Sequence, residues 1–299
     1  MVKKPLHFDG IFPPIPTPFD RDDRIDEHAI ANNLRFLNNY GLKGYVVLGS
    51  NGEAVLLKEQ EKLQVLEAAR ALIPSDRLMI AGTGCESTGE TIALSKNAAK
   101  IGADAVLVIT PSYYKGRMTS EALIHHFHMV AEAAPIPVLI YNMPACTGID
   151  LSAETVSAVA EHPNVIGIKD SSGNVMNMAD IRRLTEPDFQ LLAGTASVLL
   201  PALSIGALGG ILALANIAPA QCLAIRRHFL NGEWDKAREL HLRMCPVNTA
   251  VTRKWGVAAL KSAMDMLGQY GGPVRSPLLP ISAEIKSKLR AILVEAGVV

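Results

Sequence analysis

Short apolar runs alternate with longer amphipathic stretches along most of this chain, and this alternation constrains the fold more than any other feature. The apolar runs cover residues 10–16, 44–48, 78–82, 105–110, 137–141, 165–169, 190–194 and 209–214. Most are continuous Val, Ile, Leu and Ala, which is typical of parallel strands buried on both faces. The stretches between them have helical periodicity, at residues 27–40, 58–72, 88–101, 120–133, 153–161 and 177–185. Eight strands separated by helices predict an α/β fold, the (β/α)8 TIM barrel.

The end of the chain follows a different pattern. After residue 232 only helical patterns remain, at residues 234–244, 247–268 and 283–296. No low-complexity tract separates them from the barrel. We therefore expect a barrel catalytic domain at residues 1–232 and a helical C-terminal extension, residues 233–299, packed on the barrel. Within the barrel, three residues stand where helix N-caps are expected: Asp26, Ser87 and Ser152.

The composition excludes several classes of function. The chain has 29 Lys and Arg against 29 Asp and Glu, so nothing attracts it generally to nucleic acid or an anionic membrane. It has no apolar run near the roughly 18 uncharged residues that a membrane span needs, and its first residues lack the apolar core of a secretory leader. The cysteines are far apart, as is typical of free thiols in a reducing compartment: Cys85, Cys146, Cys222 and Cys245. A cytoplasmic protein is expected.

A barrel would place its chemistry just after the apolar runs, because active sites of this fold lie at the carboxyl ends of the strands. Lys169 ends one run. A lysine there loses hydration, which favours the neutral amine that can attack a carbonyl and form a Schiff base. The alternative is a structural salt bridge, for example with Asp170. Tyr141 ends the preceding run, so it should face Lys169, where it could move protons beside an imine or could be a core residue at the rim.

The segment Gly49-Ser-Asn-Gly-Glu53 follows the second run. Its glycines allow a ligand to approach the backbone closely, and Ser50 and Asn51 add side-chain donors, which suits a carboxylate. The alternative is a glycine-rich turn before the helix at Lys58. Because the segment lacks the Gly-Lys-Ser/Thr ending of a phosphate loop, no nucleotide site is predicted.

Histidines cluster at only one place, His125, His126 and His128. On a helix the first and third share a face, which could suit a metal ion if a carboxylate lay nearby. The surrounding stretch is amphipathic, which favours surface or packing roles for these side chains. We therefore predict no metal site.

Three segments together resemble the dihydrodipicolinate synthase/N-acetylneuraminate lyase superfamily: Gly49-Ser-Asn-Gly-Glu53, Tyr141-Asn-Met-Pro144 and Ile168-Lys169-Asp170. The resemblance implies a homotetrameric barrel that acts on pyruvate-type 2-oxo acids through a Schiff base on Lys169, with Tyr141 as proton relay. Such a mechanism needs no metal or organic cofactor. Tyr113, rather than Tyr114, would join the relay from a neighbouring subunit. The residues expected to hold or line the substrate are Ser50, Asn51, Ser171, Gly194 and Ile211.

Departures from the synthase pattern favour a narrower activity. The synthases carry an arginine two residues after the proline of Tyr-Asn-x-Pro, where this chain has Cys146, and they read Thr-Thr where it has Ser50 and Asn51. The Ser-Asn form resembles 4-hydroxy-2-oxoglutarate aldolases, which predicts cleavage of a 4-hydroxy-2-oxo acid to pyruvate and an aldehyde such as glyoxylate. The alternatives are a sugar-acid aldolase or dehydratase, dihydrodipicolinate synthase itself, a metal-dependent aldolase using the histidines, and a non-catalytic binding protein.

Overall fold

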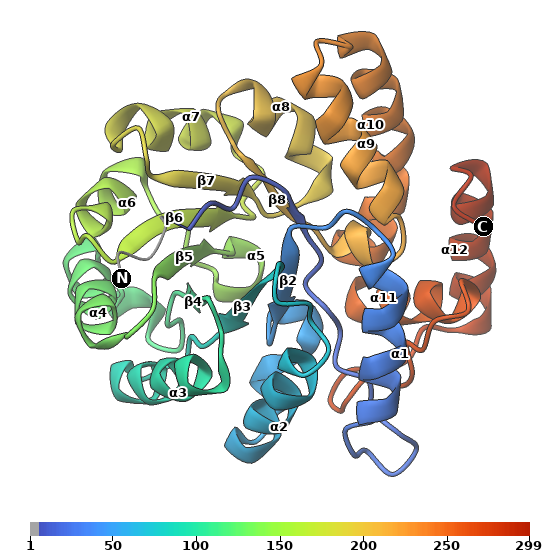
Figure 1. The fold of residues 1–299 in the computed structure, drawn as a ribbon, viewed down its shortest axis with the longest axis horizontal. Helices are drawn as coiled ribbons and strands as arrows, with labels where there is room; N and C mark the ends of the chain where they lie inside the picture. The colour runs from blue at the N-terminus through green and yellow to red at the C-terminus, as the bar shows by residue number, and fades with distance from the viewer. Residues whose placement is uncertain (1–5) are drawn as a thin grey trace.

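Eight parallel strands form a single ring at the centre of the molecule, as the apolar runs predicted (Figure 1). The structure is a computed structural model that describes residues 6–299. The strand order is β1-β8-β7-β6-β5-β4-β3-β2. The strands are β1 (Ile11–Phe12), β2 (Gly44–Val47), β3 (Leu78–Gly82), β4 (Ala105–Ile109), β5 (Val138–Asn142), β6 (Val165–Asp170), β7 (Gln190–Ala193) and β8 (Gly209–Ile211).

The ring closes between the first two strands through an irregular seam. The Lys43 amide donates to the Ile11 carbonyl at 3.1 Å, the Val46 amide to the Pro13 carbonyl at 3.0 Å, and the Ile15 amide to the Val46 carbonyl at 2.9 Å. Strand β1 itself covers only two residues, fewer than the run at 10–16 predicted. The reason is that Pro13, Pro14 and Pro16 have no amide hydrogen to place in a ladder.

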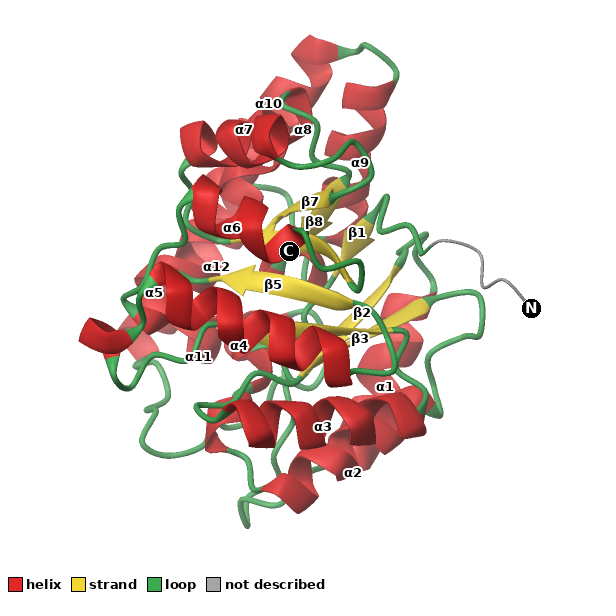
Figure 2. Ribbon diagram, turned by 90° about the vertical axis from the view of Figure 1, so that its left-hand side faces the viewer, coloured by secondary structure: helices red, strands yellow, loops and turns green. Residues whose placement is uncertain are grey.

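Helices surround the ring on its outside (Figures 1 and 2). Asp26, Ser87 and Ser152 each accept a hydrogen bond from a backbone amide of the first turn, so the three predicted N-caps are confirmed. The short α5 and the helices α8 and α9 were not predicted. The barrel helices are α1 (Glu27–Asn38), α2 (Glu59–Arg70), α3 (Thr88–Ile101), α4 (Ser120–Ala133), α5 (Pro144–Thr147), α6 (Ala153–Ala160), α7 (Val175–Leu184), α8 (Leu199–Ser204) and α9 (Pro219–Leu230).

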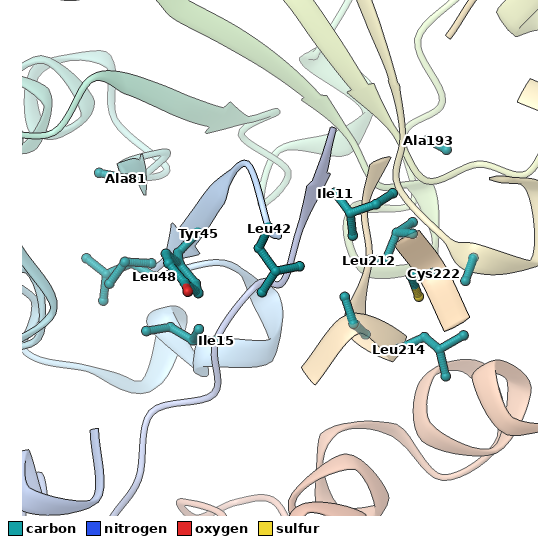
Figure 3. Close-up of a cluster of buried hydrophobic side chains, with 14 of the residues drawn as sticks. Ile11, Ile15, Leu42, Tyr45, Leu48, Ala81, Ala193, Leu212, Leu214 and Cys222 are labelled. Carbon is teal, nitrogen blue, oxygen red and sulfur yellow. The ribbon is translucent and has the colours of Figure 1, made fainter. Parts of the chain in front are cut away.

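Alternation along the strands divides the apolar side chains into two cores. An inner cluster takes Phe8 from the segment before β1 and one or two residues from each of seven strands, so it must fill the inside of the ring: Phe12, Val46, Ile80, Ala105, Leu107, Leu139, Tyr141, Leu192 and Ile211. The remaining buried residues form a larger outer core between strands and helices, part of which Figure 3 shows around Ile11, Leu42 and Leu212. Strand β6 gives the inner cluster no fully buried apolar side chain: Gly167 and Lys169 lie at the register positions of Leu139 and Tyr141, and only the partly buried Ile166 packs against the cluster from this strand.

The C-terminal extension packs beside the barrel. It consists of α10 (Trp234–Thr249), a π-helical turn (Ala250–Lys254), α11 (Gly256–Met266) and α12 (Ala283–Glu295). A helix break near Pro246 was predicted and is wrong: α10 continues through this proline, and the break falls at Gly256, which has φ 63°. Helix α10 contacts α9 and α12, and the division at residue 232 remains a prediction. Within the described residues, no helix combines the length and the apolar character that a membrane crossing needs.

Candidate active site

Lys169 and Tyr141 lie side by side at the carboxyl end of the ring. They are register partners on the neighbouring strands β6 and β5. The Lys169 Nζ lies 3.8 Å from the centre of the Tyr141 ring. The two residues are 3 % and 4 % exposed, respectively. The strand order therefore brings an amine and a phenol together in a buried position, as the two apolar runs predicted.

Asp170 faces the other way from Lys169. Its carboxylate accepts from the Asn142 Nδ2 at 2.9 Å and from the Ser172 amide at 2.9 Å, outside the ring. Burial raises the pKa of Asp170, and the hydrogen bonds from Asn142 and Ser172 oppose that effect. The alternative of a Lys169–Asp170 salt bridge is wrong, and residues 6–299 contain no other carboxylate paired with Lys169. Lys169 therefore forms no ion pair with a carboxylate within residues 6–299.

The loop after β2 completes the cluster. Residues Ser50–Gly52 form a 3-10 turn, and the Ser50 Oγ lies 3.2 Å from the Tyr141 hydroxyl. Asn51 lies in the same turn and is half-buried. Leu48, two residues before this turn, and Glu53, directly after it, both have positive φ, 63° and 53°. Since side chains other than glycine rarely adopt this conformation, the rest of the fold must hold the turn in place.

Glu53 is the part of this loop that sequence analysis gave no role. Its side chain is buried against the C-terminal extension, where its Oε1 lies 2.5 Å from the Nζ of Lys261 on α11. Its Oε2 accepts from the Arg275 amide at 2.8 Å. No local pattern could have predicted this contact, because Glu53 and Arg275 are 222 positions apart.

Three further predicted substrate residues lie around the same end of the ring. The Ser171 hydroxyl is buried and has no hydrogen-bond partner among the described residues. Gly194 packs so closely against β6 that a Cβ there would lie 2.0 Å from the Ser171 Oγ and 2.6 Å from the Asp170 carbonyl oxygen. Ile211 ends β8 and belongs to the inner cluster with Tyr141. This end of the ring thus has a buried hydroxyl without a hydrogen-bond partner among residues 6–299, together with a tightly packed glycine and an apolar side chain.

Tyr113 lies apart from this cluster. It is 79 % exposed, on the loop after β4, and its ring packs edge-on against that of Tyr114 at 5.1 Å between centroids. The Glu86 carboxylate fixes this loop by accepting from the Ser112 amide at 2.9 Å and the Tyr113 amide at 2.8 Å. A single chain therefore presents the tyrosine outward and does not bring it to Lys169.

Cys146 occupies the mouth of the site on the short helix α5 and is exposed. Partial burial of the thiol raises its pKa, and the nearby Lys169 charge and a hydrogen bond from the Ser50 hydroxyl act in the opposite direction. The position where the synthases carry an arginine thus faces the same space as Lys169 and Ser50, and it holds an uncharged side chain.

The histidines of α4 point to separate partners. His126 is buried and hydrogen-bonds through Nδ1 to the Thr88 hydroxyl at 2.9 Å, and burial lowers its pKa to about 4, with the His125 charge adding to the effect. His128 contacts the Ala158 carbonyl at 3.1 Å instead. Across residues 6–299, no three His, Cys, Asp or Glu side chains converge in a way that could hold a metal ion.

Comparison with known families places this site in context. Residues 7–296 match the model of the dihydrodipicolinate synthetase family. The chain belongs to this family. Members of the dihydrodipicolinate synthetase family are pyruvate-dependent carbon–carbon lyases, and the chain is an enzyme of that class. The superfamily and the TIM barrel expected from the sequence are both confirmed.

Similar proteins in this family carry the synthase name. The 4-hydroxy-tetrahydrodipicolinate synthase of Methanothrix thermoacetophila is 38 % identical over 96 % of each chain. That of Methanococcoides burtonii is 36 % identical over 97 % of this chain and 99 % of its own. The narrower resemblance to 4-hydroxy-2-oxoglutarate aldolases is therefore not supported by these names, which favour the synthase alternative.

Solved structures of the family have the same fold. A dihydrodipicolinate synthase from Cyanidioschyzon merolae with lysine bound gives a TM-score of 0.93 at 31 % identity and covers 98 % of this chain and 100 % of its own. The prophage protein YagE of Escherichia coli K12, solved in complex with pyruvate, gives 0.92 at 30 % identity, with the same coverage.

Proposed function

We propose that Lys169 forms an imine with pyruvate or a closely related 2-oxo acid, and that carbon–carbon bond chemistry takes place on this intermediate. The observation that carries the proposal is the buried Lys169 Nζ, 3.8 Å from the Tyr141 ring and without a carboxylate partner in residues 6–299. The amine attacks the 2-oxo carbon, the carbonyl oxygen leaves as water, and the resulting iminium accepts electrons from the neighbouring carbon–carbon or carbon–hydrogen bond.

Tyr141 would move the protons that this chemistry requires. Its hydroxyl meets the Ser50 Oγ at 3.2 Å, so a proton can pass between them and a substrate oxygen bound beside the imine. Ser50, Asn51 and backbone amides of their turn would hold the 2-oxo acid carboxylate, and Ser171 would hydrogen-bond the substrate, with Gly194 and Ile211 as walls. The proposed mechanism uses no metal and no organic cofactor.

We also propose that the working enzyme is a homotetramer in which Tyr113 serves a neighbouring copy. The tyrosine is exposed, yet its loop is fixed by Glu86. An exposed aromatic side chain on a loop whose backbone is held in place is suited to packing into another molecule. In that arrangement the hydroxyl of Tyr113 would extend the proton path of a partner's Tyr141.

Two observations favour different second substrates. The names of the relatives favour the synthase reaction, in which the enamine of pyruvate condenses with aspartate semialdehyde. The uncharged Cys146 at the mouth favours the reverse type of reaction, cleavage of 4-hydroxy-2-oxoglutarate, because the arginine that binds the semialdehyde carboxylate in synthases is missing. In this cleavage Tyr141 takes the 4-hydroxyl proton, the C3–C4 bond breaks, glyoxylate leaves, and the enamine returns to pyruvate.

Aspartate semialdehyde and 4-hydroxy-2-oxoglutarate both carry a carboxylate besides that of the pyruvate part, and this carboxylate needs a cation. The structure offers Lys115. Its Nζ reaches across from the loop after β4 and lies 3.2 Å from where a Cβ of Gly148 would stand, two residues beyond Cys146. None of the carboxylates within residues 6–299 forms a salt bridge with Lys115. We propose that Lys115 supplies the positive charge that Cys146 lacks.

Borohydride trapping tests the core of this proposal. The enzyme is incubated with pyruvate, reduced and digested, and the modified residue is located by mass spectrometry; Lys169→Ala is the control. An adduct on Lys169 is expected, and its absence refutes the imine mechanism. Rates with aspartate semialdehyde plus pyruvate, with 4-hydroxy-2-oxoglutarate and with 2-keto-3-deoxy sugar acids then identify the second substrate.

A further inference from the structure

A buried ion pair links the Ser50 turn to the C-terminal extension. The side chains of Glu53 and Lys261 are each 1 % exposed and lie 2.5 Å apart. Removing two charges from water costs more free energy than their attraction commonly returns, so a buried pair is a poor device for stability alone. Apolar residues of similar volume would serve a purely structural purpose as well.

The surroundings of Lys261 fix its ammonium group in one place. It donates to the Pro273 carbonyl at 2.8 Å and lies 4.4 Å from the centre of the Phe19 ring. Burial lowers the pKa of Lys261, while the Glu53 charge and hydrogen bond raise it. A Cβ on Gly271 would lie 1.9 Å from the Lys261 carbonyl oxygen, so the segment after α11 packs directly against this residue.

Arg275 gives the same loop a second attachment to the extension. Its amide binds Glu53, and its guanidinium donates to the Asp23 Oδ1 at 3.0 Å and to the Glu61 Oε2 at 2.8 Å. Within residues 6–299, the non-glycine residues with positive φ are Asp23, Leu48 and Glu53. Arg275 binds two of these three residues, Asp23 and Glu53. The third, Leu48, lies two residues before the Ser50–Gly52 turn, and Glu53 follows that turn directly. The extension therefore binds two loops at residues whose backbone conformation is unfavourable, Asp23 and Glu53.

We propose that Lys261 is a positioning residue: through Glu53 it sets the place of the Ser50–Gly52 turn, and hence the affinity of the pocket for the substrate carboxylate. This inference rests on the proposed imine mechanism. Lys261 touches neither Lys169 nor Tyr141 within the hydrogen-bond and ion-pair contacts of residues 6–299. Its loss should thus change carboxylate binding and leave the amine intact.

Two ketones separate these effects, because pyruvate has a carboxylate and acetone has none. Borohydride trapping at Lys169 is measured against the concentration of each ketone in the intact enzyme and in Lys261→Met. The half-saturating pyruvate concentration should rise about tenfold to a hundredfold, as expected when a binding group is displaced by about 1 Å. Trapping by acetone should remain within about twofold of the intact enzyme.

Two further variants keep the test independent of folding. Leu293→Ala removes a fully buried side chain of α12 and should destabilise the extension, but Leu293 takes no part in the hydrogen bonds or the ion pair of Lys261 and Glu53. This variant should leave the pyruvate-to-acetone ratio unchanged. Where Lys261→Met fails to fold, the double variant Glu53→Gln with Lys261→Met leaves no stranded charge. It should fold and still need more pyruvate for half-saturation.

The outcomes distinguish the two proposals. If the intact enzyme traps neither ketone on Lys169, the imine mechanism itself is wrong. If it traps pyruvate and the folded Lys261 variants need the same pyruvate concentration within about twofold, the positioning role is wrong. The positioning role would also be wrong if Lys261→Met lost pyruvate and acetone trapping to the same extent and Leu293→Ala showed the same loss. Such a result would show general damage to the barrel.

Discussion

Replacing Gly194 by alanine tests how rigidly the site is built. The added methyl group would lie 2.6 Å from the Asp170 carbonyl oxygen and 2.0 Å from the Ser171 Oγ. The serine side chain can rotate away, but the carbonyl belongs to β6 and accepts a hydrogen bond from the Gly194 amide. To reach ordinary contact at about 3.4 Å, β6 and the loop after β7 must separate by roughly 0.8 Å.

This separation acts directly beside Lys169. Overpacking of this kind typically costs about 1–3 kcal/mol of stability, and a shift of about 1 Å at a reacting group lowers rates by up to about a hundredfold. We therefore expect Gly194→Ala to lower the thermal midpoint by several degrees and to slow pyruvate trapping at Lys169 by at least about tenfold.

The matched control is Gly89→Ala, in which nothing lies within 4 Å of the new Cβ and φ is not positive. This change adds the same methyl group to helix α3 and should leave trapping unaffected. Both variants are measured by thermal denaturation and by the rate of borohydride trapping. A Gly194→Ala protein with unchanged midpoint and trapping would show that β6 and β7 move apart easily, and the account of a rigid pocket would fail.

Three other changes give independent tests. Tyr141→Phe should still form the imine but lose about 10²–10⁴-fold in turnover, measured as pyruvate release, because only the proton path is removed; equal loss of trapping would contradict this. Burial lowers the pKa of His126 from 6.5 to about 4, so the unfolded chain takes up this proton first and the free energy of unfolding should fall as the pH drops from about 6.5 to about 4. Denaturant titrations of His126→Gln should show a weaker fall than the intact protein, and identical slopes would refute the assignment. Lys115→Met should raise KM for the carboxylate-bearing second substrate about tenfold and leave pyruvate trapping unchanged; an unchanged KM would remove Lys115 from the site.

The sequence predicted the barrel well because each strand and most helices are marked by residues that are close together in the chain. A buried parallel strand is a continuous apolar run, and a helix such as α3 begins after a serine cap and ends at Gly102, which has φ 101°. Helices α8 and α9 were missed although Pro219 stands in the first turn of α9, a common helix start. Strand β1 was predicted too long because its prolines were given too little weight.

The residues of the site can also be divided into those that local sequence predicts and those that it does not. Lys169 and Tyr141 could be placed from two apolar runs, since neighbouring strands of a barrel end together. The partners of Glu53 could not be predicted from the sequence, because Lys261 and Arg275 contact Glu53 only when the extension is packed against the barrel. Tyr113 could not be placed in this way: it is 79 % exposed on the loop after β4, and its role in a neighbouring copy is a proposal.

The seam between β1 and β2 has a consequence for the behaviour of the chain before the ring closes. A closed barrel has no free sheet edge, but an open one has two, and such edges recruit strands of other molecules. At this seam one edge carries Pro13, Pro14 and Pro16, which cannot donate a hydrogen bond to an incoming strand. The residues that shorten β1 therefore also make this edge a poor template for the strands of other molecules.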